Sequence, residues 1–330
     1  MAQLFTKYYL YFGLLTGMCY GLFNFFIYIA VNGVMDLRTI YLLNIFSILY
    51  YIGFHSQVGI SLKQEKGTFW TKEDSAYIKS NGKLDIRLVV IIICRFFSQL
   101  CSTLIMYMIL ITSIQSGINA SIIFSIYAGA SIFCSLAFYV IYKESLSLKH
   151  VLGIIIVFLS VVLIANGNYE PTQQTKDRLA ITTEADETSV MIPITLAIVN
   201  CFIFVFNSIL VREVRKTKIS TSQYTADSQL MIASLWTVLG IHQHFYVQTY
   251  TWTEAMPVLI ASIMYTLGLI FFNGAISYGI AGPVQAMIQI QAPFQLILEV
   301  IFTKSYPSIL GLSGMVVCIA GALLLIFSKH

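Results

Sequence analysis

The chain has 330 residues, of which 58% are hydrophobic and only 10% charged, and its mean hydropathy is +0.80. Soluble domains contain about 45–50% apolar and about 25% charged residues, so this composition excludes a soluble globular protein and indicates a polytopic membrane protein whose main surroundings are the lipid bilayer. The formal net charge of +4 comes without a lysine- or arginine-rich arm, so no nucleic acid partner is expected.

Long apolar segments recur along the whole chain. A membrane-spanning helix needs roughly 20 mostly apolar residues. The sequence predicts ten of them, which indicates an all-α membrane protein: 8–31, 39–60, 87–111, 116–141, 149–166, 190–211, 226–248, 254–277, 281–303 and 308–327. The first segment is long enough to remain as a spanning helix, so no cleavable signal peptide is expected.

The first expected helix carries a row of small residues. Gly13, Gly17 and Gly21 stand at i, i+4 and i+8, a spacing that lets two helices approach closely. We expect packing within the chain first, a hinge second and a homodimer interface third, so a homodimer stays open. Asn24, on the same helix, is a candidate for lining a cavity.

The third expected helix contains an arginine. Arg95 follows Arg87 by eight residues, which places it about 12 Å into the membrane at 1.5 Å per residue. At that depth it should face the interior of the bundle. Its planar guanidinium suits a phosphate or a carboxylate of a solute, and a structural ion pair or a bond to backbone carbonyls is equally open. Gln99, one turn further, shares its face.

Other polar residues give weaker signals. Tyr127 could stack on a base or a sugar, although in a chain with 20 tyrosines packing is the commoner role. Asn200 and Asn207 share one face of the sixth expected helix, where cavity lining and helix packing are both open. His55 is expected at the membrane interface. No catalytic motif is present, and the six cysteines lack metal-site spacing, so neither an enzyme nor a metal nor a cofactor is expected.

The ninth expected helix is unusually polar. Its sequence from 282 to 299 reads GPVQAMIQIQAPFQLILE. At 100° per residue, four polar side chains fall in a stripe roughly 120° wide: Gln285, Gln289, Gln295 and Glu299. Polar groups in hydrocarbon cost free energy unless they face a partner or a watery cavity. The stripe favours a cavity over bonding between helices, with the glutamines contacting a solute and Glu299 in a coupling or gating role. Gln291 lies further off this face, and Pro293 frees the carbonyl of Gln289.

Lysine and arginine placement predicts the orientation. With the N-terminus in the cytoplasm, 14 of the 19 basic residues fall on the inner side, four on the outer side, and Arg95 lies within a helix. Cytoplasmic loops are generally the ones rich in lysine and arginine. Both termini are therefore expected in the cytoplasm, whether the membrane is the plasma membrane or an endomembrane.

A hydrophilic loop over 167–189 divides the chain into halves 1–166 and 190–330, each with five expected helices. The halves echo each other, because residues 142–165 align with 303–326 and pair Lys143 with Lys304. Five is an odd number, so the second half should enter the membrane inverted relative to the first. Inverted repeats are a recurring plan of secondary transporters, with the substrate site at mid-membrane between the repeats.

Two segments carry a family resemblance. FYVIYKESLSLKHVLGIIIVFLSVVLIA resembles the close of an EamA repeat, and AISYGIAGPVQAMIQIQAPFQLILEVIF resembles the corresponding part of a second repeat. The chain from 8 to 327 is thus similar to the drug/metabolite transporter superfamily, which includes nucleotide-sugar transporters. The resemblance implies repeat-end family positions at Lys143, Glu144 and Lys304, although Ser305 stands where the second acid would fall. The Phe-Tyr-Asn-Asn and Gly-Ala-Leu-Asn-Lys signatures of the GDP-mannose branch are absent from the sequence.

These features predict a permease with alternating access to a central site. The resemblance implies a metabolite or a nucleotide-sugar-like solute, and Arg95 favours an anionic one. The main alternative is a receptor or scaffold that keeps the fold without transporting. A channel would need polar stripes on several helices, and a membrane-embedded transferase would need a carboxylate or histidine constellation that the sequence lacks.

Overall fold

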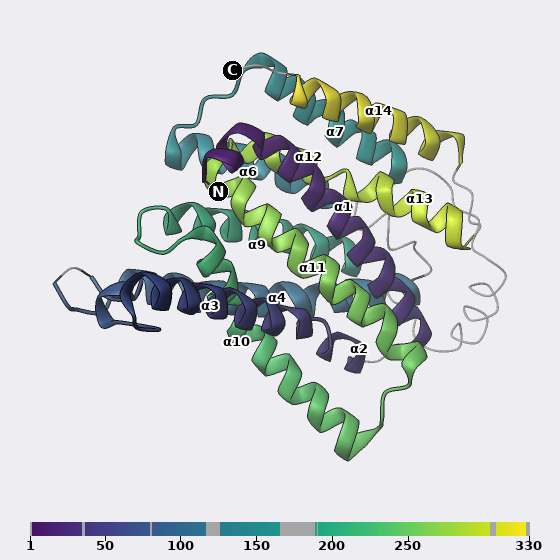
Figure 1. Ribbon diagram of the computed structural model, residues 1–330. Helices are drawn as coiled ribbons and strands as arrows, with labels where there is room; N and C mark the ends of the chain where they lie inside the picture. Colours follow the sequence, from purple (N-terminus) through teal and green to yellow (C-terminus); the bar gives the residue numbers. More distant parts are fainter. Residues whose placement is uncertain are drawn as a thin grey trace.

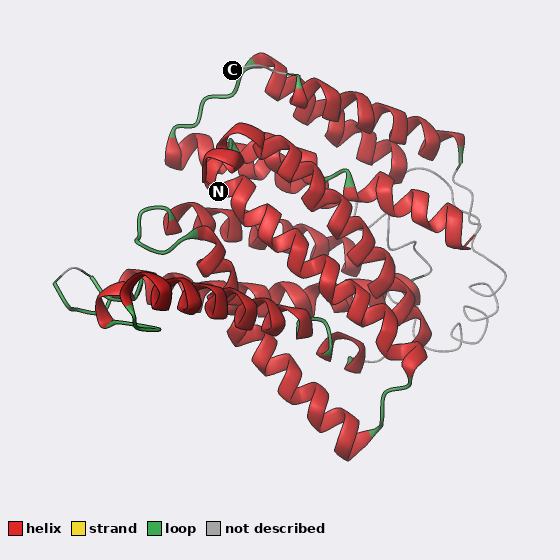
Figure 2. Ribbon diagram, in the orientation of Figure 1, coloured by secondary structure: helices red, strands yellow, loops and turns green. Residues whose placement is uncertain are grey.

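The computed structural model describes residues 2–34, 37–79, 81–116, 126–165, 189, 191–303 and 308–327. Within these ranges the regular elements are helices, and the pairing of Ile78 with Leu84 is an isolated bridge (Figure 2). The expected all-α class is therefore confirmed. Lys304 and Ser305 lie outside the described residues.

The helices follow one another in the order that the apolar segments predict (Figure 1). Those of the first half are α1 (Ala2–Val34), α2 (Arg38–Tyr41), α3 (Ile45–Lys66), η1 (Lys72–Asp74), α4 (Ile86–Gln115), η2 (Ile126–Ala128), α6 (Gly129–Tyr142) and α7 (Leu148–Ala165). Those of the second half are α9 (Met191–Val214), α10 (Thr221–His242), the π-helical η3 (Gln243–Val247), α11 (Trp252–Tyr278), α12 (Ala281–Ile288), α13 (Gln291–Thr303) and α14 (Ile309–Ile326).

Seven helical segments of the described chain are long and apolar enough to cross a membrane: Gln3–Val31, Arg38–Lys66, Ile86–Ser113, Met191–Val214, Trp252–Tyr278, Ala281–Phe302 and Ile309–Ile326. Shorter apolar helices cover Ile126–Tyr142 and Leu148–Leu163. These two helices and α10 occupy the positions of the other three expected segments. The chain thus has the helices of a multi-pass membrane protein.

The last helices of the two halves, α7 and α14, lie side by side (Figure 1). Gly153 of α7 faces Leu325, so that a Cβ on the glycine would be 2.6 Å from the leucine side chain. Four residues later, Val157 packs against Gly321. Because the residue numbers rise along one helix as they fall along the other, α7 and α14 run antiparallel.

The ninth expected helix is interrupted. The structure divides 281–303 into α12 and α13, with a turn at Gln289 and Ile290. The carbonyl of Gln289 accepts a hydrogen bond from the backbone N–H of Ala292 at 3.2 Å, three residues on instead of four. Pro293 has no N–H with which to continue the helical pattern at this carbonyl. The expectation of one continuous helix is therefore wrong at this point, and the proline accounts for the break.

The glycine row of α1 packs against this interruption. A Cβ on Gly17 would lie 2.7 Å from the carbonyl oxygen of Ile288, and one on Gly21 would lie 2.9 Å from the carbonyl oxygen of Gln291. A Cβ on Gly13 would lie 3.1 Å from the side chain of Met287. Such close approach requires small residues. The expected packing role of the row within the chain is confirmed.

A methyl group at Gly17 should therefore destabilise the protein. Overpacking of a tight contact costs about 1–3 kcal/mol, so Gly17→Ala is expected to lower the unfolding temperature of the detergent-purified protein. Gly53→Ala on α3 is the matched control, because nothing lies within 4 Å of a Cβ there. Equal unfolding temperatures for the two variants would contradict the close packing.

Candidate functional site

A cavity lies inside the helix bundle, between α1, α4, α9, α11 and the interrupted α12–α13 segment. It contains about 860 Å³ of space free of protein atoms, part of which is continuous with solvent, and the centre of a water molecule can move through about 90 Å³ of it. One water needs roughly 10–15 Å³ on the latter measure. The cavity thus has room for several waters or a small solute.

Carboxamides and aromatic rings dominate the wall of this cavity. The carboxamides are Asn24, Gln99, Asn200, Asn207, Gln285, Gln289 and Gln291. The rings belong to Tyr20, Phe23, Tyr127, Phe204, Tyr265 and Phe272. Arg95 is the charged residue among the described lining residues, which include no acid. Apolar walls with a few placed polar groups are typical of small-molecule sites.

Six of the seven expected substrate-binding residues meet at this cavity: Gln285, Gln289, Arg95, Gln99, Tyr127 and Asn24. The seventh, Gln295, is buried outside the cavity lining, and its side-chain nitrogen donates to Glu299 at 2.9 Å. The reason is the turn at Gln289 and Ile290. It resets the angular phase of the segment, so the expected continuous stripe does not extend into α13.

The same turn brings Gln291 onto the cavity, where the helical phase did not place it. Its side-chain nitrogen donates to the side-chain oxygen of Gln289 at 3.3 Å, and its own side-chain oxygen accepts from Asn24 at 3.5 Å. Pro293 was the sequence signal that could have placed Gln291, because a proline indicates a change of helical phase nearby.

Gln285 of α12 and Gln289 in the turn after it make long hydrogen bonds within the protein. Gln285 donates to the hydroxyl of Ser208 at 3.4 Å, and Gln289 donates to the carbonyl of Gln285 at 3.4 Å. Typical N–H···O bonds are about 2.9–3.0 Å long. The amides of Gln285 and Gln289 therefore line the cavity while bonded to the protein at longer distances than usual.

Asn200 and Asn207 both line the cavity. The side-chain nitrogen of Asn200 donates to the hydroxyl of Tyr127 at 2.9 Å, and Asn207 accepts from the hydroxyl of Ser98. The structure therefore combines the two roles that the sequence left open, because each asparagine bonds a neighbouring helix while facing the cavity.

Arg95 is almost wholly buried, with 1% of its surface exposed. Its Nη2 donates to Asn273 at 3.4 Å. Its Nη1 makes no hydrogen bond within the described chain, and no salt bridge to Arg95 is found there. A buried cation without an acidic partner is unusual, because charges removed from water are normally paired. The alternative of a structural ion pair thus has no support in these residues.

One end of α11 is fastened by charged side chains of other helices. Lys143 ends α6 in the left-handed conformation (φ 56°), and Glu144 follows it. The carboxylate of Glu144 accepts from the backbone N–H of Ala281 at 3.1 Å and lies 2.8 Å from Arg212. Arg212 also donates to the carbonyl of Gly279 at 2.6 Å. The repeat-end position Glu144 therefore caps α12 and holds the turn that precedes it.

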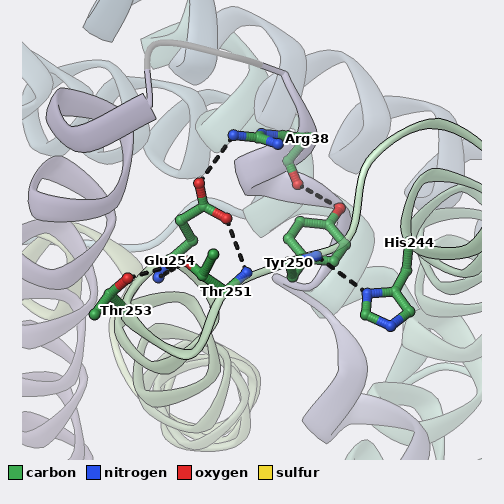
Figure 3. Close-up of polar contacts among 6 residues, drawn as sticks. All are labelled: Arg38, His244, Tyr250, Thr251, Thr253 and Glu254. Atoms are coloured by element: carbon green, nitrogen blue, oxygen red, sulfur yellow. Dashed lines mark hydrogen bonds and ion pairs between the residues drawn. The ribbon is translucent and has the colours of Figure 1, made fainter.

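A second ion pair lies at the other end of α11 (Figure 3). Glu254, in the first turn, forms a capping box with Thr251 and lies 2.9 Å from Nη2 of Arg38. The hydroxyl of Tyr250 donates to the backbone carbonyl of Arg38 at 2.9 Å, and the ring of His244 accepts from the backbone N–H of Tyr250 (Figure 3). Both ends of the helix are thus tied to the other half of the chain.

Helix α3 and the loop that precedes α4 are both bonded to Asp227 of α10. His55 contacts one carboxylate oxygen of Asp227 at 2.6 Å, and the hydroxyl of Tyr77 donates to the other at 2.7 Å. Burial, followed by the hydrogen bond to Asp227, raises the pKa of Tyr77 well above its usual range. The side chain of His55 is half-exposed, and its expected position at the membrane interface stays a prediction. Asp227 was not among the residues that the sequence singled out.

Comparison with known proteins supports the overall fold but identifies no family and no function. No family model matches the chain, and its sequence has no significant match among curated proteins. A solved structure described only as a crystal structure of a protein resembles this fold with a TM-score of 0.56. The similarity covers 93% of this chain and 96% of that chain at 12% sequence identity. Likeness at such low identity concerns the fold alone.

Removal of Glu144 should destabilise the bundle. Breaking a mostly buried pair by deleting one partner costs about 3–5 kcal/mol, so Glu144→Ala is expected to lower the free energy of unfolding by that order. A double-mutant cycle with Arg212→Ala should give a coupling energy above about 1 kcal/mol. The control is Glu73→Ala at an exposed site, expected within about 0.5 kcal/mol of the parent protein. Additive effects of Glu144→Ala and Arg212→Ala would contradict the contact.

Proposed function

We propose that this protein is a secondary transporter that moves a small polar metabolite by alternating access to the central cavity. The observation that carries the proposal is the uncompensated Arg95 at a cavity walled by carboxamides and aromatic rings. A buried charge in a membrane segment is costly and usually marks a substrate pathway. Several hydrogen-bonding groups around one charge suit a polar solute that must be bound reversibly.

Helix packing supports two inverted five-helix repeats. A two-fold axis between such repeats would exchange each expected helix with the one five places away. The contact of α1 with α11 would then map onto that of α9 with α4, and both contacts are present. Likewise α3 with α11 would map onto α10 with α4, which are also in contact. The antiparallel pair α7 and α14 would map onto itself. This plan, with both termini in the cytoplasm, agrees with the resemblance to the drug/metabolite transporter superfamily.

The two fastened ends of α11 suggest how access would alternate. Near one end lies the ion pair of Arg212 with Glu144. At the other end, the ion pair of Arg38 with Glu254 joins α2 to α11. In an alternating mechanism the contacts at one end open while those at the other stay closed. Opening either end would require its ion pair to separate, and the cavity lies between them.

The solute that fits this wall carries a negative charge. Arg95 would bind a phosphate or carboxylate, and Gln285, Gln289 and Gln291 would bond its polar groups. The rings of Tyr20, Tyr127 and Tyr265 line the same cavity, where they would pack against a base or a sugar. A nucleotide sugar has these features, as do other anionic metabolites. Glu299, bonded by Gln295 outside the cavity lining, is proposed to act in coupling or gating.

The first test is a thermal-stability screen of the detergent-purified protein. The panel contains nucleotide sugars, sugar phosphates, nucleobases, amino acids and organic cations. A ligand that binds the folded state raises the unfolding temperature by mass action. We expect anions to give the largest shifts, and Gln289→Ala to reduce them. Uptake of the binding solute into proteoliposomes then distinguishes a transporter from a receptor or scaffold, which would bind without uptake.

Arg95→Gln is expected to abolish uptake while leaving expression and the unfolding temperature close to those of the parent protein. The physical reason is that the variant removes the charge that the solute meets and keeps hydrogen-bonding capacity. Arg87→Gln on the same helix is the matched control, because Arg87 is largely exposed and pairs with Glu213. Unchanged uptake by Arg95→Gln would refute the role of Arg95, and loss of folding would show that the residue is structural.

A further inference from the structure

The described surroundings of Arg95 solvate its charge without neutralising it. Arg95 is held by two neutral side chains, Gln99 and Asn273. Gln99 is in turn bonded to Gln229 and Tyr265, and all four of these residues are buried or partly buried. Arginine in a protein interior is ordinarily held by a carboxylate. Here amides contact the guanidinium, and hydroxyls fix the orientation of these amides.

The orientation of Asn273 is fixed by α10. The hydroxyl of Thr225 donates to the backbone carbonyl of Thr221 at 2.8 Å, so its oxygen is left as an acceptor. The side-chain nitrogen of Asn273 donates to that oxygen at 2.8 Å. The amide oxygen must then point the other way, toward Arg95, where Nη2 approaches it at 3.4 Å. Asn273 is completely buried, which leaves its amide little freedom to turn.

Gln99 holds the same guanidinium from within α4. In the amide orientation that satisfies both ends of the side chain, its oxygen accepts from Nη2 of Arg95 at 3.0 Å and from Nε at 3.3 Å. Its nitrogen then donates to the hydroxyl of Tyr265 at 3.0 Å and to the side-chain oxygen of Gln229 at 3.3 Å. Hydrogen-bond satisfaction is the usual criterion for orienting an amide. Two amide oxygens thus take up Nη2 and Nε, and Nη1 keeps its hydrogens unused in the described chain.

We propose that Asn273 and Gln99 are positioning residues that determine specificity: they hold Arg95 by neutral dipoles, so that its full positive charge is left for the solute. The inference rests on the transport function proposed above and adds the selection of anionic over neutral solutes. A carboxylate has nearly the shape of a carboxamide, so either position could have neutralised Arg95 at no steric expense. With a carboxylate there, the site would bind an anion and its neutral analogue more equally.

The test replaces the amide by its isosteric acid. Asn273→Asp and the parent protein are compared for binding of matched probes by thermal stabilisation: uridine 5′-monophosphate against uridine, glucose 6-phosphate against glucose, and inorganic phosphate alone. The parent is expected to bind at least one anion more tightly than its neutral partner. Asn273→Asp should reduce that ratio of affinities at least tenfold, through weaker anion binding, while affinity for the neutral partner stays within threefold.

Three further variants separate charge from structure. Asn273→Ser removes the contact without adding charge and should keep the preference for the anion. Asn200→Asp adds the same charge on the same cavity, where Asn200 bonds Tyr127 instead of Arg95, and should change the ratio much less. Gln99→Glu repeats the test from α4 and should act as Asn273→Asp does. A merely structural role for Asn273 would weaken the binding of both members of a pair equally.

Several results would overturn the inference. They are an unchanged ratio in Asn273→Asp, an equal loss in Asn273→Ser, and a parent protein that none of the anions stabilises more than its neutral partner. A carboxylate beside an uncompensated guanidinium should be tolerated, so failure of both acidic variants to fold also counts against it. Uptake of a neutral solute by the parent would leave the transport function standing and refute only the selection of anions.

Discussion

The packing of the glycine row of α1 against the interrupted segment α12–α13 is the contact on which the cavity depends. At Gly17 and Gly21 the backbone of α1 lies against the carbonyls of Ile288 and Gln291. A side chain larger than hydrogen would separate the two segments at this point. Because an interrupted helix leaves backbone polar groups without their usual partners, it is tolerated at membrane depth only where protein or water surrounds it. The glycine row provides the protein on one side, and the cavity lies on the other.

From this interruption the polar wall can be followed around the bundle. Gln289 and Gln291 stand at the break, and their amides lead to Asn24 on α1 and back along α12 to Gln285. Arg95 contributes the charge, and the amides that hold it come from its own helix and from α11. A cavity with one fixed charge and many adaptable dipoles can bind firmly at one point and loosely elsewhere. Such a balance would allow release as well as binding, as the proposed transport cycle requires.

Much of the fold follows from local patterns in the sequence. Apolar segment lengths predicted where helices lie, the spacing of Gly13, Gly17 and Gly21 predicted close packing, and depth from Arg87 predicted that Arg95 is buried. Helical phase predicted that Gln285 and Gln289 share a cavity, but failed for Gln291 and Gln295, because the phase changes at the turn before Pro293. A turn of two residues is enough to bring Gln291 to the cavity and to place Gln295 outside its lining.

The neighbours of Arg95 could not be predicted in the same way. Asn273, Gln229 and Tyr265 have no distinguishing spacing, and their roles arise from which helices meet in space. Asp227 was missed for the same reason, since its partners His55 and Tyr77 are distant in the chain. Sequence patterns report the face of a single helix. A site assembled from helices that are distant in the chain is visible only once their packing is known.

The attachment of Glu144 to the start of α12 has a consequence for how the protein is made. The two groups are separated by 137 residues, and a ribosome adds about 5–20 residues per second. The carboxylate of Glu144 is therefore synthesised roughly 7 to 27 seconds before the backbone N–H that it caps. Its cationic partner Arg212 emerges midway through that interval. During synthesis this contact thus cannot form until much of the second half has been added, and a chain truncated before Ala281 would leave the carboxylate of Glu144 without the backbone N–H that it caps.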